Sequence, residues 1–321
     1  MRSAPPVDRV WTELRDTPGV RIEHLVSGFG PAELGALIRE TGARTLVNCV
    51  GNTNVVVPYR ELRSANVELV SAMAQTCAAS GTRLVHLSTY VVNGDVAAPQ
   101  VVDPRQAPYP YAASKALAEL AVAGVGGELD FTIVRLPRVL GTPAQLLGSA
   151  DILVSVADAC HALQAYPAVE LTEEVTTGRA AAGSILGRLP EFGGPEELGR
   201  GIDVLRGQAV GYRELLGTVA AEEVDSHEWK RRLDESDWAK ADPRRWSVID
   251  AWIGLGMRLG GRSYAEYLAA YPVLPLGIRT VGELVATPPP VQALLAQTWS
   301  GTQRGCPTTY QQTPPDSEGW Q

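Results

Sequence analysis

The sequence lacks the features that mark membrane, secreted and metal-binding proteins. No run of eighteen apolar residues occurs along its 321 residues, which excludes an ordinary transmembrane helix. The opening residues, Met1-Arg2-Ser3-Ala4-Pro5-Pro6, do not form the apolar stretch of a secretory signal. The four cysteines contain no Cys-x-x-Cys pair, and the four histidines are equally dispersed. We therefore expect a cytoplasmic protein in a reducing compartment, with no membrane partner, no disulfide framework and no metal site.

Positive charge is also in short supply. The chain has 28 lysines and arginines against 36 acidic residues, which gives a net charge of −8. Nucleic-acid-binding proteins normally carry a basic surface, so we expect no nucleic-acid partner. Apolar residues make up 45% of the chain, enough for one large core or two modest ones.

What the sequence does contain is an alternation of strand and helix patterns over residues 1–145. Helices are expected at 7–16, 32–41, 58–80 and 111–123, and strands at 20–26, 44–49, 84–87 and 130–136. Strands that alternate with helices of ten or more residues favour a doubly wound, parallel sheet with the connecting helices on its faces. The sequence therefore predicts an α/β protein with a Rossmann-like sheet.

The pattern changes after Gly141, where helices dominate. Helices are expected near 152–165, 179–186 and 212–223, and residues 226–285 are rich in tryptophan and arginine. We interpret residues 146–287 as a smaller, mostly helical substrate-binding lobe with the tryptophans in its core. Residues 288–321 are rich in proline, threonine and glutamine, and are predicted to be a partly disordered tail.

Three side chains in the first part of the chain suit proton delivery to a carbonyl oxygen. Thr89 ends an apolar strand, and Tyr111 and Lys115 are spaced to lie on one face of the following helix. The ammonium of Lys115 is expected to lower the pKa of the Tyr111 phenol from ~10, and the Thr89 hydroxyl can orient the same oxygen. A tyrosine and a lysine at this spacing are often ordinary surface residues. The preceding strand, which ends in Ser88-Thr89, favours the catalytic interpretation.

A fold of this kind normally binds a dinucleotide on a glycine-rich loop after its first strand. The one candidate loop is Gly28-Phe29-Gly30-Pro31-Ala32-Glu33. A carboxylate at Glu33 replaces the third glycine, and Pro31 removes a backbone amide that could bind phosphate. The next strand, near 44–49, also ends without an acid for the adenosine ribose. We interpret this segment as an ordinary turn between a strand and a helix.

The segment at Val47–Val67, VNCVGNTNVVVPYRELRSANV, resembles the stretch of thioester reductase domains that reads roughly HNAAxVNxxxPYxxLRxxNV. His86–Thr89 is similar to their strand with the catalytic serine or threonine, and Tyr111–Lys115 matches their YxxxK. Thr132–Gly141 is similar to their RPGRxxG segment, with Leu136-Pro137 in place of Pro-Gly. These domains are extended short-chain dehydrogenase/reductases of nonribosomal peptide and polyketide synthetases, and they resemble the reductase part of carboxylic acid reductases. The resemblance covers roughly residues 8–285.

The resemblance implies an NAD(P)H-dependent reductase that releases a carrier-bound acyl or peptidyl thioester as an aldehyde or alcohol in secondary metabolism. It implies NADPH as cofactor, with NADH as the alternative, and an acyl or peptidyl carrier protein as partner. Catalysis is assigned by the resemblance to Thr89, Tyr111 and Lys115. The cofactor contacts that it implies are Val50, Gly51, Asn66, Ser88, Tyr111, Lys115 and Pro137.

In this register the expected strand at Val20–Val26 is the third strand of the family, so the first two strands and the glycine loop lie outside the sequence. Three accounts stay open. The sequence starts late, a second chain supplies the missing strands, or a repurposed protein without redox activity promotes cyclisation or release or serves as a partner subunit. A further alternative is a sugar-nucleotide epimerase or dehydratase, which shares the catalytic residues but differs over Val55–Val67.

Overall fold

The computed structural model describes residues 14, 16–22, 30–55, 57–92, 103–104, 107, 109–126, 129–194, 200–254, 279–285 and 293–297. Contacts divide the chain into two compact units. Unit 1 is Met1–Pro137, Ala182–Arg206 and Arg258–Val285; unit 2 is Arg138–Ala181, Gly207–Met257 and Ala286–Gln321. The sequence predicted one boundary near residue 145. The chain first passes from unit 1 to unit 2 between residues 137 and 138, close to that position. Two later segments, 182–206 and 258–285, belong to unit 1 again.

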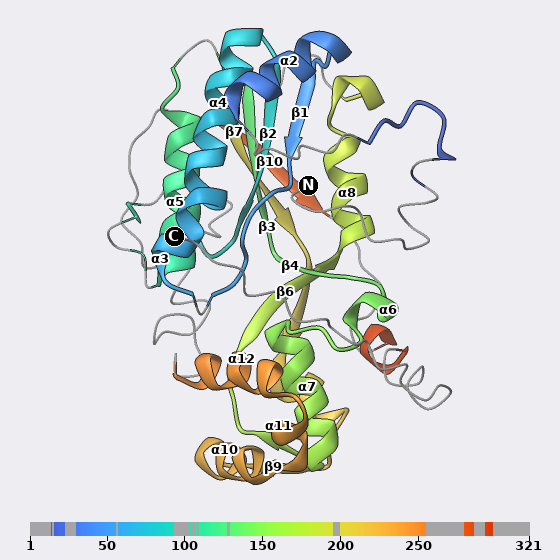
Figure 1. Ribbon diagram of the computed structural model, residues 1–321. Helices are drawn as coiled ribbons and strands as arrows, with labels where there is room; N and C mark the ends of the chain where they lie inside the picture. The colour runs from blue at the N-terminus through green and yellow to red at the C-terminus, as the bar shows by residue number, and fades with distance from the viewer. Residues whose placement is uncertain are drawn as a thin grey trace. The chain divides into compact units, whose positions relative to one another are not determined.

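Unit 1 is built on a parallel sheet (Figure 1). Its strands lie in the order β1-β2-β3-β7-β10, and each pair of neighbours is parallel. The strands are β1 (Thr45–Asn48), β2 (Arg83–Thr89), β3 (Phe131–Leu136), β7 (Gly201–Arg206) and β10 (Arg279–Val285). The predicted α/β fold with a Rossmann-like sheet is therefore confirmed. The strands β7 and β10 were not predicted.

The helices of unit 1 begin and end where the local sequence requires. Helix α2 (Pro31–Thr41) has proline in its first turn, and its C-terminal Gly42 adopts a left-handed backbone with φ 64°. Helix α4 (Leu69–Ser80) ends in the same way at Gly81, with φ 66°. Gly42 ends α2 shortly before β1, and Gly81 ends α4 shortly before β2. The two strands pair in parallel, with Thr45 opposite Arg83 and Asn48 opposite His86.

The helix predicted at 58–80 forms, but it is not a uniform α-helix. It consists of α3 (Tyr59–Arg63), a π-helical turn η1 (Ser64–Glu68) and α4. The buried residues Leu62, Asn66 and Val70 follow one another at intervals of four, so one face stays inside the protein across the π turn. Such turns occur often at functional sites, and this one carries Asn66.

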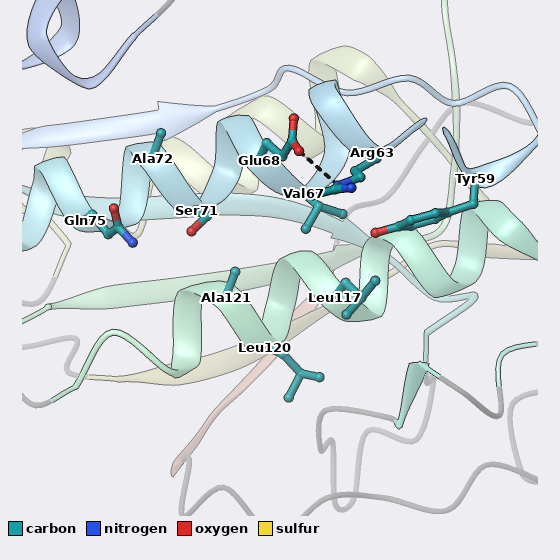
Figure 2. A pocket seen from close by; sticks show the side chains of 10 residues that line it. All are labelled: Tyr59, Arg63, Val67, Glu68, Ser71, Ala72, Gln75, Leu117, Leu120 and Ala121. Carbon is teal, nitrogen blue, oxygen red and sulfur yellow. Dashed lines mark ion pairs between the residues drawn. The ribbon is translucent and has the colours of Figure 1, made fainter. Parts of the chain in front are cut away.

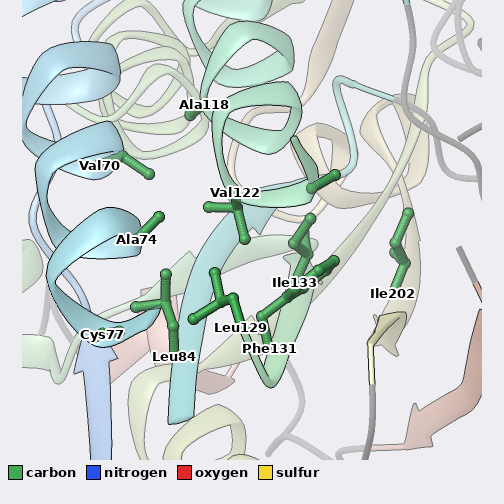
Figure 3. Packing of buried hydrophobic residues seen from close by; sticks show 11 residues of the cluster. Val70, Ala74, Cys77, Leu84, Ala118, Val122, Leu129, Phe131, Ile133 and Ile202 are labelled. Atoms are coloured by element: carbon green, nitrogen blue, oxygen red, sulfur yellow. The ribbon is translucent and has the colours of Figure 1, made fainter. Parts of the chain in front are cut away.

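An apolar cluster joins helices to the sheet (Figure 3). Helix α4 and helix α5 (Pro110–Ala123) pack their apolar faces against β2, β3 and β7. The cluster contains Val70, Ala74, Cys77, Leu84, Ala118, Val122, Ala123, Leu129, Phe131, Ile133 and Ile202. Each large apolar side chain contributes about 1.5–3 kcal/mol when fully buried, so this layer holds α5 firmly against β2.

Unit 2 contains strands as well as helices, so the prediction of a mostly helical lobe was incomplete. One small sheet has the order β4-β6-β8 and a second pairs β5 with β9. The strands are β4 (Arg138–Leu140), β5 (Ala165–Pro167), β6 (Thr172–Thr177), β8 (Gln208–Gly211) and β9 (Glu222–Val224). These strands are three to six residues long and carry polar residues, which weakened their periodic signal.

The described helices of unit 2 agree in part with the prediction. They are α6 (Pro143–Leu146), α7 (Ile152–Leu163), α8 (Gly178–Leu186, whose last five residues belong to unit 1), α9 (Tyr212–Gly217), α10 (Ser226–Glu235), α11 (Asp237–Ala241) and α12 (Pro243–Gly254). The helix expected at 212–223 ends early at Gly217. Of the four tryptophans predicted to lie in the core, Trp229 and Trp252 are buried, while Trp238 and Trp246 are only half-buried. The Trp229 indole donates to the Ala165 carbonyl at 2.9 Å.

Several expectations fall wholly or partly outside the described residues. Of the helix expected at 7–16, only Leu14 and Asp16 are described, and both are helical. Of the strand expected at Val20–Val26, the described residues 20–22 are not in a strand. Within the predicted tail, residues 293–297 form a short helix whose Leu294 and Leu295 are buried, so this part of the tail is ordered. None of the helices that are described is long and apolar enough to cross a membrane.

Candidate active site

The predicted catalytic residues come together where β2 ends and α5 begins. Side chains alternate along β2, so Thr89 and Ser88 point to opposite faces of the sheet. Tyr111 lies in the first turn of α5 and forms a side-chain hydrogen bond with Thr89. Lys115 follows one turn later and donates from Nζ to the Leu87 carbonyl oxygen at 3.2 Å. Tyr111 and Lys115 are both buried, at 9% and 6% exposure.

Gly51 brings the loop after β1 close to the lysine. A Cβ atom at this position would lie 3.3 Å from Lys115 Nζ and 3.4 Å from Asn66 Oδ1. Glycine therefore leaves space beside the ammonium and the amide that a larger residue would occupy. The space adjoins an exposed loop, because Val50 is 51% exposed.

The amide of Asn66 fixes this loop from inside the π-helical turn. Its Oδ1 accepts from the Asn52 backbone N–H at 2.6 Å, and its Nδ2 donates to the Asn52 carbonyl at 2.9 Å. The second Nδ2 hydrogen goes to Ser114 Oγ at 2.9 Å, and Ser114 donates to the Tyr111 carbonyl at 2.7 Å. Asn66 thus connects the loop after β1 to the first turn of α5.

The pKa of the tyrosine differs from the prediction. Burial raises the pKa of Tyr111 to about 12, and the hydrogen bond from Thr89 opposes this rise only in part. The prediction that Lys115 lowers this pKa is not supported in the ligand-free chain. The reason is that removal of the phenol from water disfavours its anion. Tyr111 is therefore a neutral hydroxyl donor at neutral pH.

Burial also disfavours the charged form of Lys115. It lowers the pKa of this lysine to about 8, while the nearby Glu119 carboxylate acts in the opposite direction. The neighbouring His86 is fully buried, and its pKa falls to about 3 through burial and the lysine charge. His86 is consequently neutral, and its Nδ1 can accept from Asn48 Nδ2 at 3.0 Å. The side chain of Asn48 in turn accepts from the Val50 backbone N–H at 2.9 Å.

Ser88 was predicted to contact the cofactor, but its side chain is engaged elsewhere. Its hydroxyl donates to Glu119 Oε1 on the α5 side of the sheet. Glu119 also forms a fully buried ion pair with Arg135 on β3, with Nη2···Oε2 at 2.6 Å. The sequence analysis missed both residues. Two sequence features could have indicated them. Arg135 is a charged residue inside an apolar strand, and Glu119 is an acid four residues after Lys115.

Pro137 lies directly after β3 and is buried. It follows the strand whose last residue, Leu136, accepts a backbone hydrogen bond from Tyr90 at 3.0 Å. This connection places Pro137 at the same sheet edge as Thr89, because β2 and β3 are parallel and Thr89 pairs with Leu136. The structure thus brings five predicted residues to one edge of the sheet: Thr89, Gly51 and Pro137 from strand ends, and Tyr111 and Lys115 from α5.

Of the glycine segment at 28–33, only residues 30–33 lie within the described part of the chain. Gly30 precedes α2, and a Cβ there would lie 2.5 Å from Glu33 Oε2. The carboxylate therefore folds back over the first turn of the helix, where an acid is favourable. The interpretation of the whole segment as a turn between a strand and a helix stays a prediction, because residues 28 and 29 are not among those described.

A separate groove of about 690 Å³ lies on the outer faces of the helices (Figure 2). Residues of α3, η1, α4 and α5 line it, and an ion pair between Arg63 and Glu68 lies along one side at 2.9 Å. None of the predicted site residues lines this groove. Among the described residues, no group of three or more histidine, cysteine, aspartate or glutamate side chains could hold a metal ion.

Comparison with known proteins places this site in a family context. Residues 28–176 match the NAD-binding family described as "Male sterility protein", and this segment contains all of the predicted site residues. The chain is 63% identical over 296 residues to an isonitrile lipopeptide synthase of Mycobacterium marinum (strain ATCC BAA-535 / M). The match covers 92% of this chain and 21% of that protein, so the chain spans about a fifth of its curated relative.

Solved structures share the fold. The terminal R domain of the myxalamid PKS-NRPS pathway superposes with a TM-score of 0.58 at 21% identity, over 85% of this chain and 71% of that one. A thiolation-reductase di-domain of an archaeal nonribosomal peptide synthetase gives 0.53 at 16%, over 84% and 59%. MoeE5 in complex with UDP-glucose and NAD gives 0.54 at 13%, over 92% and 94%. These structures confirm the Rossmann-like fold, and two of them are reductase domains of the kind that the sequence was predicted to resemble.

Proposed function

We propose, on the premise of this resemblance, that the chain is an NADPH-dependent reductase of carrier-bound acyl or peptidyl thioesters. The observation that carries the proposal is the convergence of Thr89, Tyr111 and Lys115 at one sheet edge. A buried, neutral phenol hydrogen-bonded to a threonine is suited to donate to a carbonyl oxygen that gains negative charge. The product of the first reduction is an aldehyde, and a second reduction gives an alcohol.

Each residue has a distinct role in this proposal. Tyr111 donates its hydroxyl hydrogen to the thioester oxygen, and Thr89 holds the phenol and the same oxygen in place. Lys115 lies one turn after the phenol on the same helix and supplies a positively charged hydrogen-bond donor beside it. Asn66 keeps the loop at Gly51–Asn52 in position through its two bonds to Asn52.

The residues around Gly51 fit a nicotinamide cofactor. The lack of a side chain at Gly51 leaves Lys115 Nζ and Asn66 Oδ1 approachable, and the neighbouring Val50 is exposed. Lys115, Tyr111 and the loop at Val50–Gly51 would hold the nicotinamide ribose, with Pro137 on the nicotinamide side. When bound, the cofactor supplies the hydride.

We further propose that unit 1 is the cofactor and catalytic unit and that unit 2 binds the acyl or peptidyl chain. The phosphopantetheine thiol would leave after the first hydride addition, and this implies a carrier protein as partner. The support is the resemblance to reductase domains, since the solved relatives include a thiolation-reductase di-domain.

The proposal is tested by turnover of an acyl-carrier thioester with NADPH. The intact chain is expected to form an aldehyde, and Tyr111→Phe is expected to lower kcat by at least ~100-fold because the proton donor is lost. Tyr59→Phe is the matched control. Its ring lines the outer groove and it keeps a phenyl group in place, so its activity is expected to stay at the level of the unchanged chain.

A direct binding experiment separates this function from its rival. Titration of NADPH fluorescence is expected to show binding in the micromolar range. An absence of NADPH binding together with an absence of turnover on any thioester would contradict the reductase proposal. Such a result would favour a protein without redox activity on the same scaffold.

A further inference from the structure

Helix α5 carries three buried polar side chains one turn apart on the face that contacts the sheet. Tyr111, Lys115 and Glu119 lie four residues apart, and Glu119 is completely buried. Glu119 has no role in the reaction proposed for Tyr111 and Lys115. A carboxylate without exposure to water requires strong local compensation to remain charged.

That compensation comes from two strands. Arg135 on β3 donates from Nε to Glu119 Oε1 at 3.1 Å and from Nη2 to Oε2 at 2.6 Å, a two-pronged contact with both side chains at 0% exposure. Ser88 on β2 donates to the same Oε1. Ser88 pairs with Arg135 in the sheet register, so one carboxylate joins α5 to two adjacent strands.

The carboxylate lies one turn after Lys115 on the same helix face and interacts electrostatically with its ammonium, which donates a hydrogen bond to the Leu87 carbonyl. Among the described residues, His86 on β2 and Glu119 on α5 interact electrostatically with Lys115. Tyr111 precedes it by one turn on α5, and Arg135 on β3 pairs with Glu119. His86 and Tyr111 are neutral at neutral pH, and Arg135 is positive. Glu119 is therefore the one negative group in this set.

We propose that Glu119, held by Arg135 and Ser88, is a positioning residue that keeps the Lys115 ammonium charged and seated beneath Gly51. The proposal rests on the proposed reductase function only for its consequence in turnover. Burial alone lowers the pKa of Lys115, and Glu119 opposes that change, so the structure gives the direction independently of any cofactor. Loss of the carboxylate would lower the fraction of Lys115 that is charged near physiological pH.

The titration of Lys115 can be measured directly by NMR because the chain has few lysines. It contains three lysines, Lys115, Lys230 and Lys240, so a sample labelled with ¹³Cε-lysine gives three side-chain NMR signals. In the unchanged 321-residue chain, the Lys115 signal is expected to titrate near pH 8. Lys230 pairs with Asp234 and Asp250, and its pKa is raised, so its signal serves as an internal reference.

Glu119→Gln is expected to move the Lys115 midpoint down by at least about half a pH unit, since a nearby opposite charge is lost. The variant leaves Arg135 without its carboxylate and can fail to fold. Glu119→Gln/Arg135→Met removes both charges, so it keeps the test valid. Glu119→Asp keeps a carboxylate and is expected to restore much of the midpoint.

The matched control breaks another guanidinium–carboxylate pair, in unit 2. Arg138 contacts Glu173 at 2.6 Å, and Glu173→Gln is expected to leave the Lys115 midpoint unchanged. A Lys115 midpoint that shifts by less than about 0.2 units in both Glu119 variants would overturn the proposal. So would an equal shift in the Glu173 control.

The same variants predict a change in turnover where the reductase is active. Activity that needs the ammonium falls as pH rises through the Lys115 midpoint, so the alkaline limb of the kcat/KM profile should move to lower pH in Glu119→Gln. A residue with a purely structural role would lower the whole profile without moving this limb. An NMR shift without any turnover would contradict the reductase function and leave the role of Glu119 intact.

Discussion

Asp203 lies in β7 with 1% of its surface exposed, and its Oδ1 has no hydrogen-bond partner within the described part of the chain. The guanidinium of Arg188 is 3.6 Å from its other oxygen. Burial raises the pKa of Asp203 from 3.8 to about 6, and Arg188 opposes this only in part. The folded chain therefore binds a proton at this site more tightly than the unfolded chain does.

This residue predicts a pH dependence of stability. Both states hold the proton below pH ~4 and both lose it above ~6, so the free energy of unfolding should fall between these values by about 2–3 kcal/mol. Asp203→Asn is expected to remove this slope, as measured by urea unfolding at pH 4, 5, 6 and 7. A variant that follows the unchanged chain in parallel over this range would contradict the assignment.

At the scale of one element, the π-helical turn η1 decides where the loop after β1 lies. The turn points Asn66 inward, and all three polar functions of its amide are used. Both backbone groups of Asn52 depend on it. A buried polar group that loses its partner costs about 1–3 kcal/mol, so the hydrogen bonds of Asn66 contribute substantially to the stability of this loop.

Asn66→Ala is consequently expected to lower the free energy of unfolding by about 2–3 kcal/mol. It should also speed hydrogen exchange at the amide of Asn52, as followed by mass spectrometry of the peptides that cover the loop. Ser64→Ala, at an exposed position of the same turn, is the control and should change stability by less than about 0.5 kcal/mol. Equal exchange at Asn52 in the two variants would show that Asn66 does not hold the loop.

At the scale of the whole molecule, the chain order and the strand order differ. Strand β3 pairs with β7, which comes after the whole first segment of unit 2, and β7 pairs with β10. Ile202 of β7 packs in the same cluster as Phe131 and Ile133. Unit 1 therefore needs three separate stretches of the sequence to complete its core.

A shortened chain of residues 1–145 is expected not to fold. It lacks β7 and β10, so the hydrogen-bonding edge of β3 and part of its apolar cluster would be exposed to water. Circular dichroism during heating should show no cooperative transition, while a chain of residues 1–297 keeps every described element and should unfold cooperatively. A sharp transition in the shorter chain would show that the first 145 residues form an independent domain.

Local signals were sufficient for much of the fold. Residues 31–41, 69–80 and 110–123 have the composition of helices with glycine or proline at their ends, and these helices form as predicted. The apolar runs at 45–48, 83–89 and 131–136 gave the parallel sheet. The strands β7 and β10 were not predicted, because they follow segments without a regular alternation of strand and helix patterns and because β7 lies far along the chain from its partner strands.

The sequence by itself determined the α/β class, the spacing of Tyr111 and Lys115 on one helix face, and the family resemblance. The first two depend on short-range periodicity, which the order of residues carries directly, and the resemblance depends on the residues of motifs such as Val47–Val67. Only the tertiary structure decided the ionisation of the site. Burial, which no spacing records, raises the pKa of Tyr111 and lowers that of Lys115. The tertiary structure also brought Glu119, Arg135 and Ser88 together from a helix and two strands, because neighbours in a sheet are set by strand order and not by distance along the chain.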